Sequence, residues 1–179
     1  MPARTALIVV DMLNRYEHED AEPLVESVRA QLPGMQRLLD AARERGVFTA
    51  YVNDHYGDWT ADRERLTEHA LAGPHAELVE PIAPAADLPF IIKARHSIFY
   101  GTQVEYMLRQ EDIQRIVLVG QVTEQCILYS ALDAYVRHFD VAVPPEAVAH
   151  IHGGLADASL TMMETNMRAE LVPADGGAF

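Results

Sequence analysis

An apolar strand that runs directly into a helix is the feature that most constrains the fold of this chain. Residues 116–119 (IVLV) form a continuous apolar run that ends at Gly120, as is typical of a parallel strand buried on both faces. Apolar residues then recur at helical spacing over residues 128–135. Because parallel strands are joined by crossover helices, this stretch favours an α/β fold.

Five further apolar runs alternate with helical patterns along the chain. They lie at residues 5–10, 47–52, 89–92, 140–143 and 169–172. A helical pattern over residues 23–45 is interrupted at Pro33, and a last helix is expected over residues 154–168. We therefore predict one domain over residues 1–179, a three-layer Rossmann-like sandwich in which helices cover both faces of a six-stranded parallel sheet.

Composition limits the partners and the compartment. The 179 residues are 49% apolar, which suits a single core, and the net charge of -13 argues against binding to nucleic acid or an anionic membrane. No apolar run approaches membrane-spanning length, and the run at residues 6–10 is too short for a signal peptide. We expect a cytoplasmic protein that acts on a small molecule and needs no cofactor.

Cys126 is the only cysteine of the chain and lies where the strand at 116–119 gives way to the helix. With Thr123 as the N-cap, Cys126 falls at about the third helical position, where free N–H groups and the helix dipole favour a thiolate. The alternative is a small buried side chain, which is how most lone cysteines are used. Placement alone leaves both interpretations open.

Two charged residues follow other predicted strands. Asp11 comes directly after the run at residues 5–10, and Lys93 follows the run at residues 89–92. Lys93 is the only lysine among 14 basic residues, which indicates a position that needs a compact ammonium group. The carboxyl ends of parallel strands lie at the edge of the sheet where ligands bind, so we expect a carboxylate, an ammonium and a thiol at this edge.

Three motifs carry these residues: LIVVDM at Asp11, IIKARHSIFYGT at Lys93 and VGQVTEQCILYSALDAY at Cys126. In their order and spacing they resemble the isochorismatase-like cysteine hydrolases, which include nicotinamidases and N-carbamoylsarcosine amidase. The resemblance implies the strand order 3-2-1-4-5-6 and a catalytic triad of Asp11, Lys93 and Cys126. It also implies a cis peptide between Val122 and Thr123, and an oxyanion hole formed by the backbone N–H groups of Thr123 and Cys126.

These residue types suit nucleophilic attack on a carbonyl carbon. Asp11 would take the thiol proton and later give it to the departing amine, and water would hydrolyse the resulting thioester. This chemistry requires burial to raise the pKa of Asp11, while Lys93 and the helix terminus lower the pKa of Cys126. We therefore expect a hydrolase that cleaves an amide or carbamoyl C–N bond of a small molecule.

Two other functions remain open on the sequence. An enol-ether hydrolase of the isochorismatase type does not need a cysteine nucleophile, so its activity would largely survive Cys126→Ala. A non-catalytic protein could instead bind a small molecule or sense oxidants through Cys126, although the chain has no second cysteine to resolve a sulfenic acid.

The substrate pocket is expected to include Tyr16, Trp59, Tyr100 and Val122, since aromatic walls suit a flat or apolar group. The family resemblance also implies a homo-oligomer, either a dimer or a tetramer.

A metal site is not predicted. Nicotinamidases have an Asp two residues before a His near the second strand, and here Asn53 takes the position of that Asp, two residues before His55. Asp54 and His55 are adjacent, and adjacent side chains on an extended chain point to opposite sides.

Overall fold

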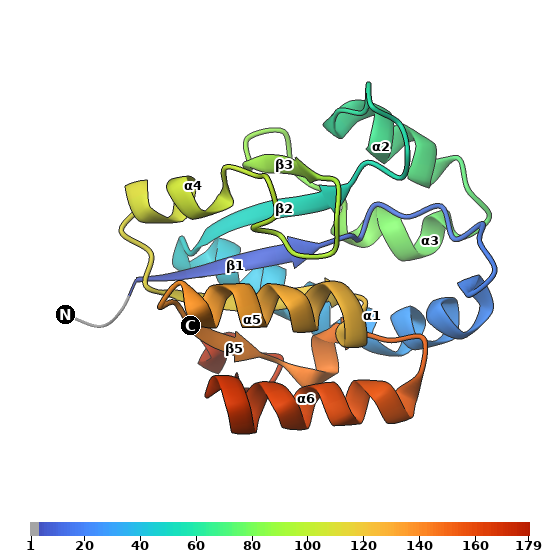
Figure 1. The fold of residues 1–179 in the computed structure, drawn as a ribbon. Helices are drawn as coiled ribbons and strands as arrows, with labels where there is room; N and C mark the ends of the chain where they lie inside the picture. The colour runs from blue at the N-terminus through green and yellow to red at the C-terminus, as the bar shows by residue number, and fades with distance from the viewer. Residues whose placement is uncertain (1–3) are drawn as a thin grey trace.

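The computed structural model describes residues 4–179, which form an α/β domain around a parallel sheet (Figure 1). The sheet has the order β3-β2-β1-β4-β5-β7, and β6 pairs separately with β4. The strands are β1 (Thr5–Val10), β2 (Phe48–Asp54), β3 (Phe90–Lys93), β4 (Arg115–Gln121), β5 (Asp140–Val143), β6 (Val148–Ala149) and β7 (Glu170–Leu171). Every pairing among them is parallel.

The predicted fold class and strand order are confirmed, but the sheet has seven strands and not six. The additional strand, β6, pairs through only two positions, Gly120 with Val148 and Gln121 with Ala149. A strand of two residues is too short to show a periodic apolar pattern. Strand β2 also extends two residues past the predicted run, so that Asp54 belongs to the strand.

Helices cover both faces of the sheet, as the ribbon view shows (Figure 1). They are α1 (Ala21–Arg45), α2 (Arg63–Leu71), α3 (Ala76–Val79), α4 (Val104–Gln110), α5 (Leu128–Val136) and α6 (Gly153–Met167). Alternate residues of β1 face opposite layers: Leu7 and Val9 pack with α1 and α3, whereas Ala6 and Ile8 pack with α4, α5 and α6. None of the described helices is long and apolar enough to cross a membrane.

The predicted interruption at Pro33 is wrong, because α1 continues through it as one helix of 25 residues. The residue after Pro33 is Gly34, and a larger side chain would not fit at this position. A Cβ atom at Gly34 would lie 2.0 Å from the carbonyl oxygen of Glu146, so the helix backbone contacts the loop after β5 directly. Packing of α1 against the sheet outweighs the one hydrogen bond that proline removes.

A close contact between β1 and β4 brings the site together. Gly120 is paired with Val10, and a Cβ atom there would lie 2.1 Å from the Val10 carbonyl oxygen. Gly120 also has φ of 115°, which L side chains rarely adopt.

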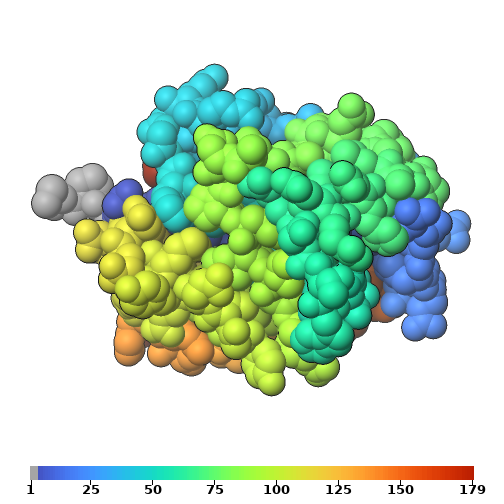
Figure 2. Space-filling model, turned by 90° about the horizontal axis from the view of Figure 1, so that it is seen from above, coloured from blue at the N-terminus to red at the C-terminus, as the bar shows by residue number. Residues whose placement is uncertain are grey.

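Viewed from above, the segments from β2 to α4 cover most of the visible face (Figure 2).

Candidate active site

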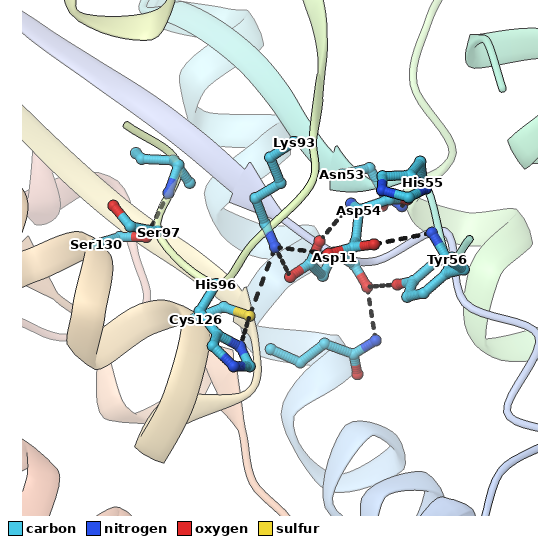
Figure 3. A network of polar contacts seen from close by, with 12 residues as sticks. Asp11, Asn53, Asp54, His55, Tyr56, Lys93, His96, Ser97, Cys126 and Ser130 are labelled. Carbon is cyan, nitrogen blue, oxygen red and sulfur yellow. Dashed lines mark hydrogen bonds and ion pairs between the residues drawn. The ribbon is translucent and has the colours of Figure 1, made fainter. Parts of the chain in front are cut away.

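Four strands deliver polar side chains to one edge of the sheet (Figure 3). Asp11 follows β1, Asp54 ends β2, Lys93 ends β3, and Cys126 lies in the turn after β4. The Lys93 Nζ atom lies 2.8 Å from Asp11 Oδ2 and 3.6 Å from Asp54 Oδ2. It also lies 3.6 Å from Cys126 Sγ. The carboxylate, ammonium and thiol predicted from the sequence are therefore in contact, together with a second carboxylate.

The backbone fixes the position of Asp11. Its N–H donates to the carbonyl of Val52 (3.0 Å), and its side-chain Oδ1 accepts the N–H of Asp54 (2.7 Å). Its own carbonyl accepts a hydrogen bond from the Gln121 amide (2.6 Å). Asp11 has φ of 56°, in the left-handed region that Asp tolerates better than most residues. These contacts leave one carboxylate oxygen directed at Lys93.

Cys126 lies in a π-helical turn, Thr123–Ile127, that leads into α5. The predicted N-cap is wrong: Val122 precedes the turn, and the Thr123 hydroxyl donates instead to the carbonyl of Ala149 (2.9 Å). The predicted cis peptide is misplaced by one residue, because it joins Gln121 to Val122. Proline does not mark this bond, so the sequence locates it only approximately.

Glu124 connects this turn to the beginning of α6. Its Oε1 atom accepts the N–H groups of Ile151 (3.0 Å) and His152 (2.8 Å). A carboxylate at a helix N-terminus is favoured by the helix dipole. The turn that carries Cys126 is therefore held to the loop between β6 and α6.

Burial dominates the ionisation of the three central groups. It raises the pKa of Asp11, an effect that the nearby Lys93 ammonium opposes. It also raises the pKa of the Cys126 thiol, and the charge of Asp11 raises it further, against the opposing effects of Lys93 and a backbone hydrogen bond from Val122. Burial alone would lower the pKa of Lys93, but the charges of Asp11 and Cys126 raise it overall.

The expected direction of the shift is therefore correct for Asp11 and wrong for Cys126. For nucleophilic attack by the thiol, the sequence predicts that Lys93 and the helix terminus lower the pKa of Cys126. Cys126 is only 8% exposed, and the cost of placing a thiolate in that environment exceeds the stabilisation that Lys93 provides. Burial and the charge of Asp11 therefore favour the protonated thiol over the thiolate.

A cavity of about 360 Å³ opens beside Cys126. Its lining residues are Asp11, Asn14, His18, Asp20, Leu24, Asp54, Tyr56, His96, Gln121, Val122, Gln125, Cys126 and Ile151. The volume suits a small molecule. Of the predicted substrate-binding residues, the structure places only Val122 at this cavity.

The three aromatic residues predicted as pocket walls lie elsewhere. Tyr16 is 3% exposed, packs in the core, and donates from its hydroxyl to Gln121 Oε1 (3.5 Å). Trp59 and Tyr100 line a separate cavity of about 200 Å³, which Lys93 also lines. Trp59 is 83% exposed and its ring lies 4.4 Å from that of His55, so it sits on the surface beside the site and not within it.

Several residues of the cavity were not predicted. His96 lies in the loop after β3, with its Nδ1 atom 3.7 Å from Cys126 Sγ and its ring 5.5 Å from that of Tyr129. Asp54 was considered only as a metal ligand, although its place after an apolar strand matches that of Asp11. Loop residues such as His96 and Asp20 carry no periodic signal that would have identified them.

The residues considered for a metal site have other partners. The Asn53 amide donates to the carbonyl groups of Leu13 (3.3 Å) and Asp54 (3.0 Å). His55 accepts the N–H of Gly57 through Nδ1 (2.9 Å). Within residues 4–179, no three His, Cys, Asp or Glu side chains are grouped closely enough to hold an ion.

Comparisons with known proteins agree on one family. The isochorismatase domain model matches residues 5–175. The isochorismatase family protein YaaI of Bacillus subtilis is 31% identical over 94% of this chain and 93% of its own length. The maleamate amidohydrolase of Pseudomonas putida is 27% identical over 88% of this chain and 78% of its own. The crystal structure of N-carbamoylsarcosine amidase from Thermoplasma acidophilum superposes with a TM-score of 0.75 and 26% identity, covering 96% of this chain and 97% of the other.

Proposed function

Because this chain belongs to the isochorismatase family of hydrolases, we propose that it cleaves an amide or carbamoyl C–N bond of a small molecule through a thioester on Cys126. The supporting observation is the contact of Lys93 Nζ with both Asp11 (2.8 Å) and Cys126 (3.6 Å), two residues that line the cavity. Amidases among the relatives support the same bond type. Asp11, Lys93 and Cys126 are the proposed catalytic residues.

In the first half of the reaction, proton transfer accompanies nucleophilic attack. The resting thiol gives its proton to Asp11 as Sγ bonds to the carbonyl carbon, since a free thiolate is disfavoured in this buried position. Asp11 then gives that proton to the nitrogen as the C–N bond breaks and the amine leaves. The raised pKa of Asp11 makes it a better base for this step than an ordinary aspartate.

In the second half, water hydrolyses the thioester. Asp11 takes a proton from the water molecule while the water oxygen attacks the carbonyl carbon of the thioester. The C–S bond breaks, and the sulfur recovers the proton from Asp11, which returns the enzyme to its starting state. Lys93, 0% exposed in its side chain, stabilises the ionised form of Asp11 between these transfers.

The developing oxyanion needs hydrogen-bond donors. The proposed donors are the backbone N–H groups of Thr123 and Cys126, in the turn that begins at the cavity. The N–H of Val122 is a further candidate, because Val122 lines the cavity and already hydrogen-bonds to the thiol.

We further propose that the protein is cytoplasmic and forms a dimer or tetramer. The oligomer rests on the family resemblance, and sedimentation velocity would test it. A monomer at micromolar concentration would contradict it.

The function is tested by ammonia release from a panel of small primary amides and ureido compounds. Wild type should release ammonia, and Cys126→Ala should lose activity almost completely. Hydroxylamine should intercept the thioester and yield a hydroxamate. If Cys126→Ala instead retains most activity, and an enol ether is cleaved, the enol-ether alternative replaces the covalent one.

A further inference from the structure

The charges at the cavity beside Cys126 are unbalanced. Three carboxylates line it, those of Asp11, Asp20 and Asp54, but neither an arginine nor a lysine does. The nearest ammonium is that of Lys93, which lies behind the lining and is already within 2.8 Å of Asp11 and 3.6 Å of Asp54. Even if Asp11 takes up a proton, two carboxylates face one ammonium. The cavity therefore has an excess of negative charge.

Asp20 contributes the part of this charge that is available to a ligand. It precedes α1, but its side chain makes no capping hydrogen bond to the helix. Among the described residues, no Arg, Lys or His forms an ion pair with it. Its half-buried carboxylate thus lies at the cavity without a partner from the protein.

The cations nearest in sequence do not compensate. Arg15 forms an ion pair with Glu17 and donates to the carbonyl of His69 (3.2 Å), away from the cavity. Arg95 is exposed and does not line the cavity. The remaining basic side chains of the lining are two imidazoles, those of His18 and His96.

The remaining polar groups of the lining are neutral amides. Asn14 and Gln125 can bind a carbonyl or an amino group of a ligand through hydrogen bonds, without any charge. The Oδ1 atom of Asn14 already accepts the N–H of Tyr16 (2.6 Å). The amide hydrogens of Asn14 remain for a ligand.

We propose that this site selects amides whose non-reacting end is cationic or neutral and rejects those that carry a carboxylate there. The inference rests on the proposed amidase function and specifies its substrate class. A substrate carboxylate would meet Asp20 and Asp54 in a partly desolvated cavity, where like charges repel strongly. Maleamate and N-carbamoylsarcosine, named for two relatives, both carry such a carboxylate, so the selectivity separates this chain from them.

The cavity potential can be measured without any substrate. Cys126 is the only cysteine, so intact mass reports its alkylation alone. The rate with neutral iodoacetamide is divided by the rate with anionic iodoacetate, and this ratio cancels the fraction of thiolate. At about pH 8 and about 0.15 M salt, where the Debye length is about 8 Å, we expect the ratio to exceed that of free β-mercaptoethanol by at least about tenfold. A ratio equal to or below that of the free thiol would overturn the proposal.

A matched pair of variants locates the charge responsible. Asp20→Asn removes one negative charge from the cavity, and Asp157→Asn removes one from the exposed face of α6. We expect Asp20→Asn to lower the ratio by about threefold or more and Asp157→Asn to leave it unchanged. Equal effects of the two would show that the net charge of the chain, and not the cavity, repels the anion.

Three amides of similar length then test the substrate class. We expect kcat/KM for ammonia release to fall in the order γ-aminobutyramide, succinamide, succinamate. A higher kcat/KM for succinamate than for succinamide would overturn the proposal, and loss of that activity in Arg95→Ala would identify Arg95 as the cation that binds the substrate carboxylate. If none of the three is hydrolysed while the alkylation ratio behaves as expected, the charge selectivity stands and the amidase function fails.

Discussion

Two charged groups near the thiol of Cys126, the Lys93 ammonium and the Asp11 carboxylate, have opposing effects on its pKa. Lys93 lowers that pKa, and Asp11 raises it in addition to the larger effect of burial. The same carboxylate is the proposed base that removes the thiol proton. Asp11 therefore has two separable effects, one on the resting thiol and one on the reaction.

Asp11→Asn should separate these effects. Loss of the negative charge should lower the thiol pKa, so that iodoacetamide alkylates Cys126 at a lower pH than in wild type. Loss of the base should reduce ammonia release by about 100-fold to 10,000-fold. The alkylation rate is measured against pH by intact mass, with Asp157→Asn as the control for a change of net charge. A higher thiol pKa in Asp11→Asn would contradict this account.

Lys93 is the residue on which two carboxylates depend, the buried one of Asp11 and the half-buried one of Asp54. Lys93→Met keeps the apolar stem but leaves Asp11 and Asp54 without a cation, which should cost about 3 to 5 kcal/mol of stability at neutral pH. Because the pKa of Asp11 would rise further, the cost should shrink as acid protonates it and grow as pH rises through that pKa. Urea unfolding at several pH values measures the effect. A loss independent of pH would indicate packing and not charge.

The sequence could predict which residues meet at the site, but not the balance of their charges. Asp11 and Cys126 follow apolar strands and Lys93 ends one, and parallel strands end at one edge of the sheet. The sign of the Cys126 pKa shift depends on burial, which three-dimensional packing decides. Asp20 and His96 come from loops whose conformations no periodic pattern specifies.

At the scale of elements, the junction of β1 and β4 positions the base relative to the nucleophile. Gly120 permits the contact with Val10 that places Asp11 beside the turn of Cys126. The apolar run and its terminal glycine predicted this strand correctly. The cis bond and the π-helical turn that follow it have no comparable signal in residue type.

Gly120→Ala should disrupt this junction. The added methyl group would lie 2.1 Å from the Val10 carbonyl oxygen, at a φ that alanine rarely adopts. We expect a loss of about 3 kcal/mol or more. The control is Gly154→Ala in α6, where nothing lies within 4 Å of the new atom, and stability should stay unchanged or rise by up to about 1 kcal/mol.

Far-UV circular dichroism in urea is the suitable measurement for this pair. The only tryptophan, Trp59, is 83% exposed, so its fluorescence would change little on unfolding. Equal stability of Gly120→Ala and wild type would mean that β1 and β4 can separate at this point without cost.

At the scale of the whole molecule, the acidic surface and the site respond differently to salt. The chain has 27 acidic and 14 basic residues, and its ion pairs are mostly exposed, such as Arg29 with Glu77. Exposed pairs contribute little, whereas a net charge of -13 repels itself throughout the fold. Screening by salt should therefore reduce the repulsion among the excess negative charges by more than it weakens the exposed ion pairs.

We expect the melting temperature to rise when NaCl is increased from about 0.02 M to about 0.5 M, since the Debye length shortens to a few ångströms. The buried contact of Lys93 with Asp11 is shielded from these ions, so the pH at which Cys126 is alkylated should change much less. Choline chloride serves as the control and should act like NaCl if screening is the cause. A melting temperature that falls with both salts would show that the exposed ion pairs stabilise the fold more than the net charge destabilises it.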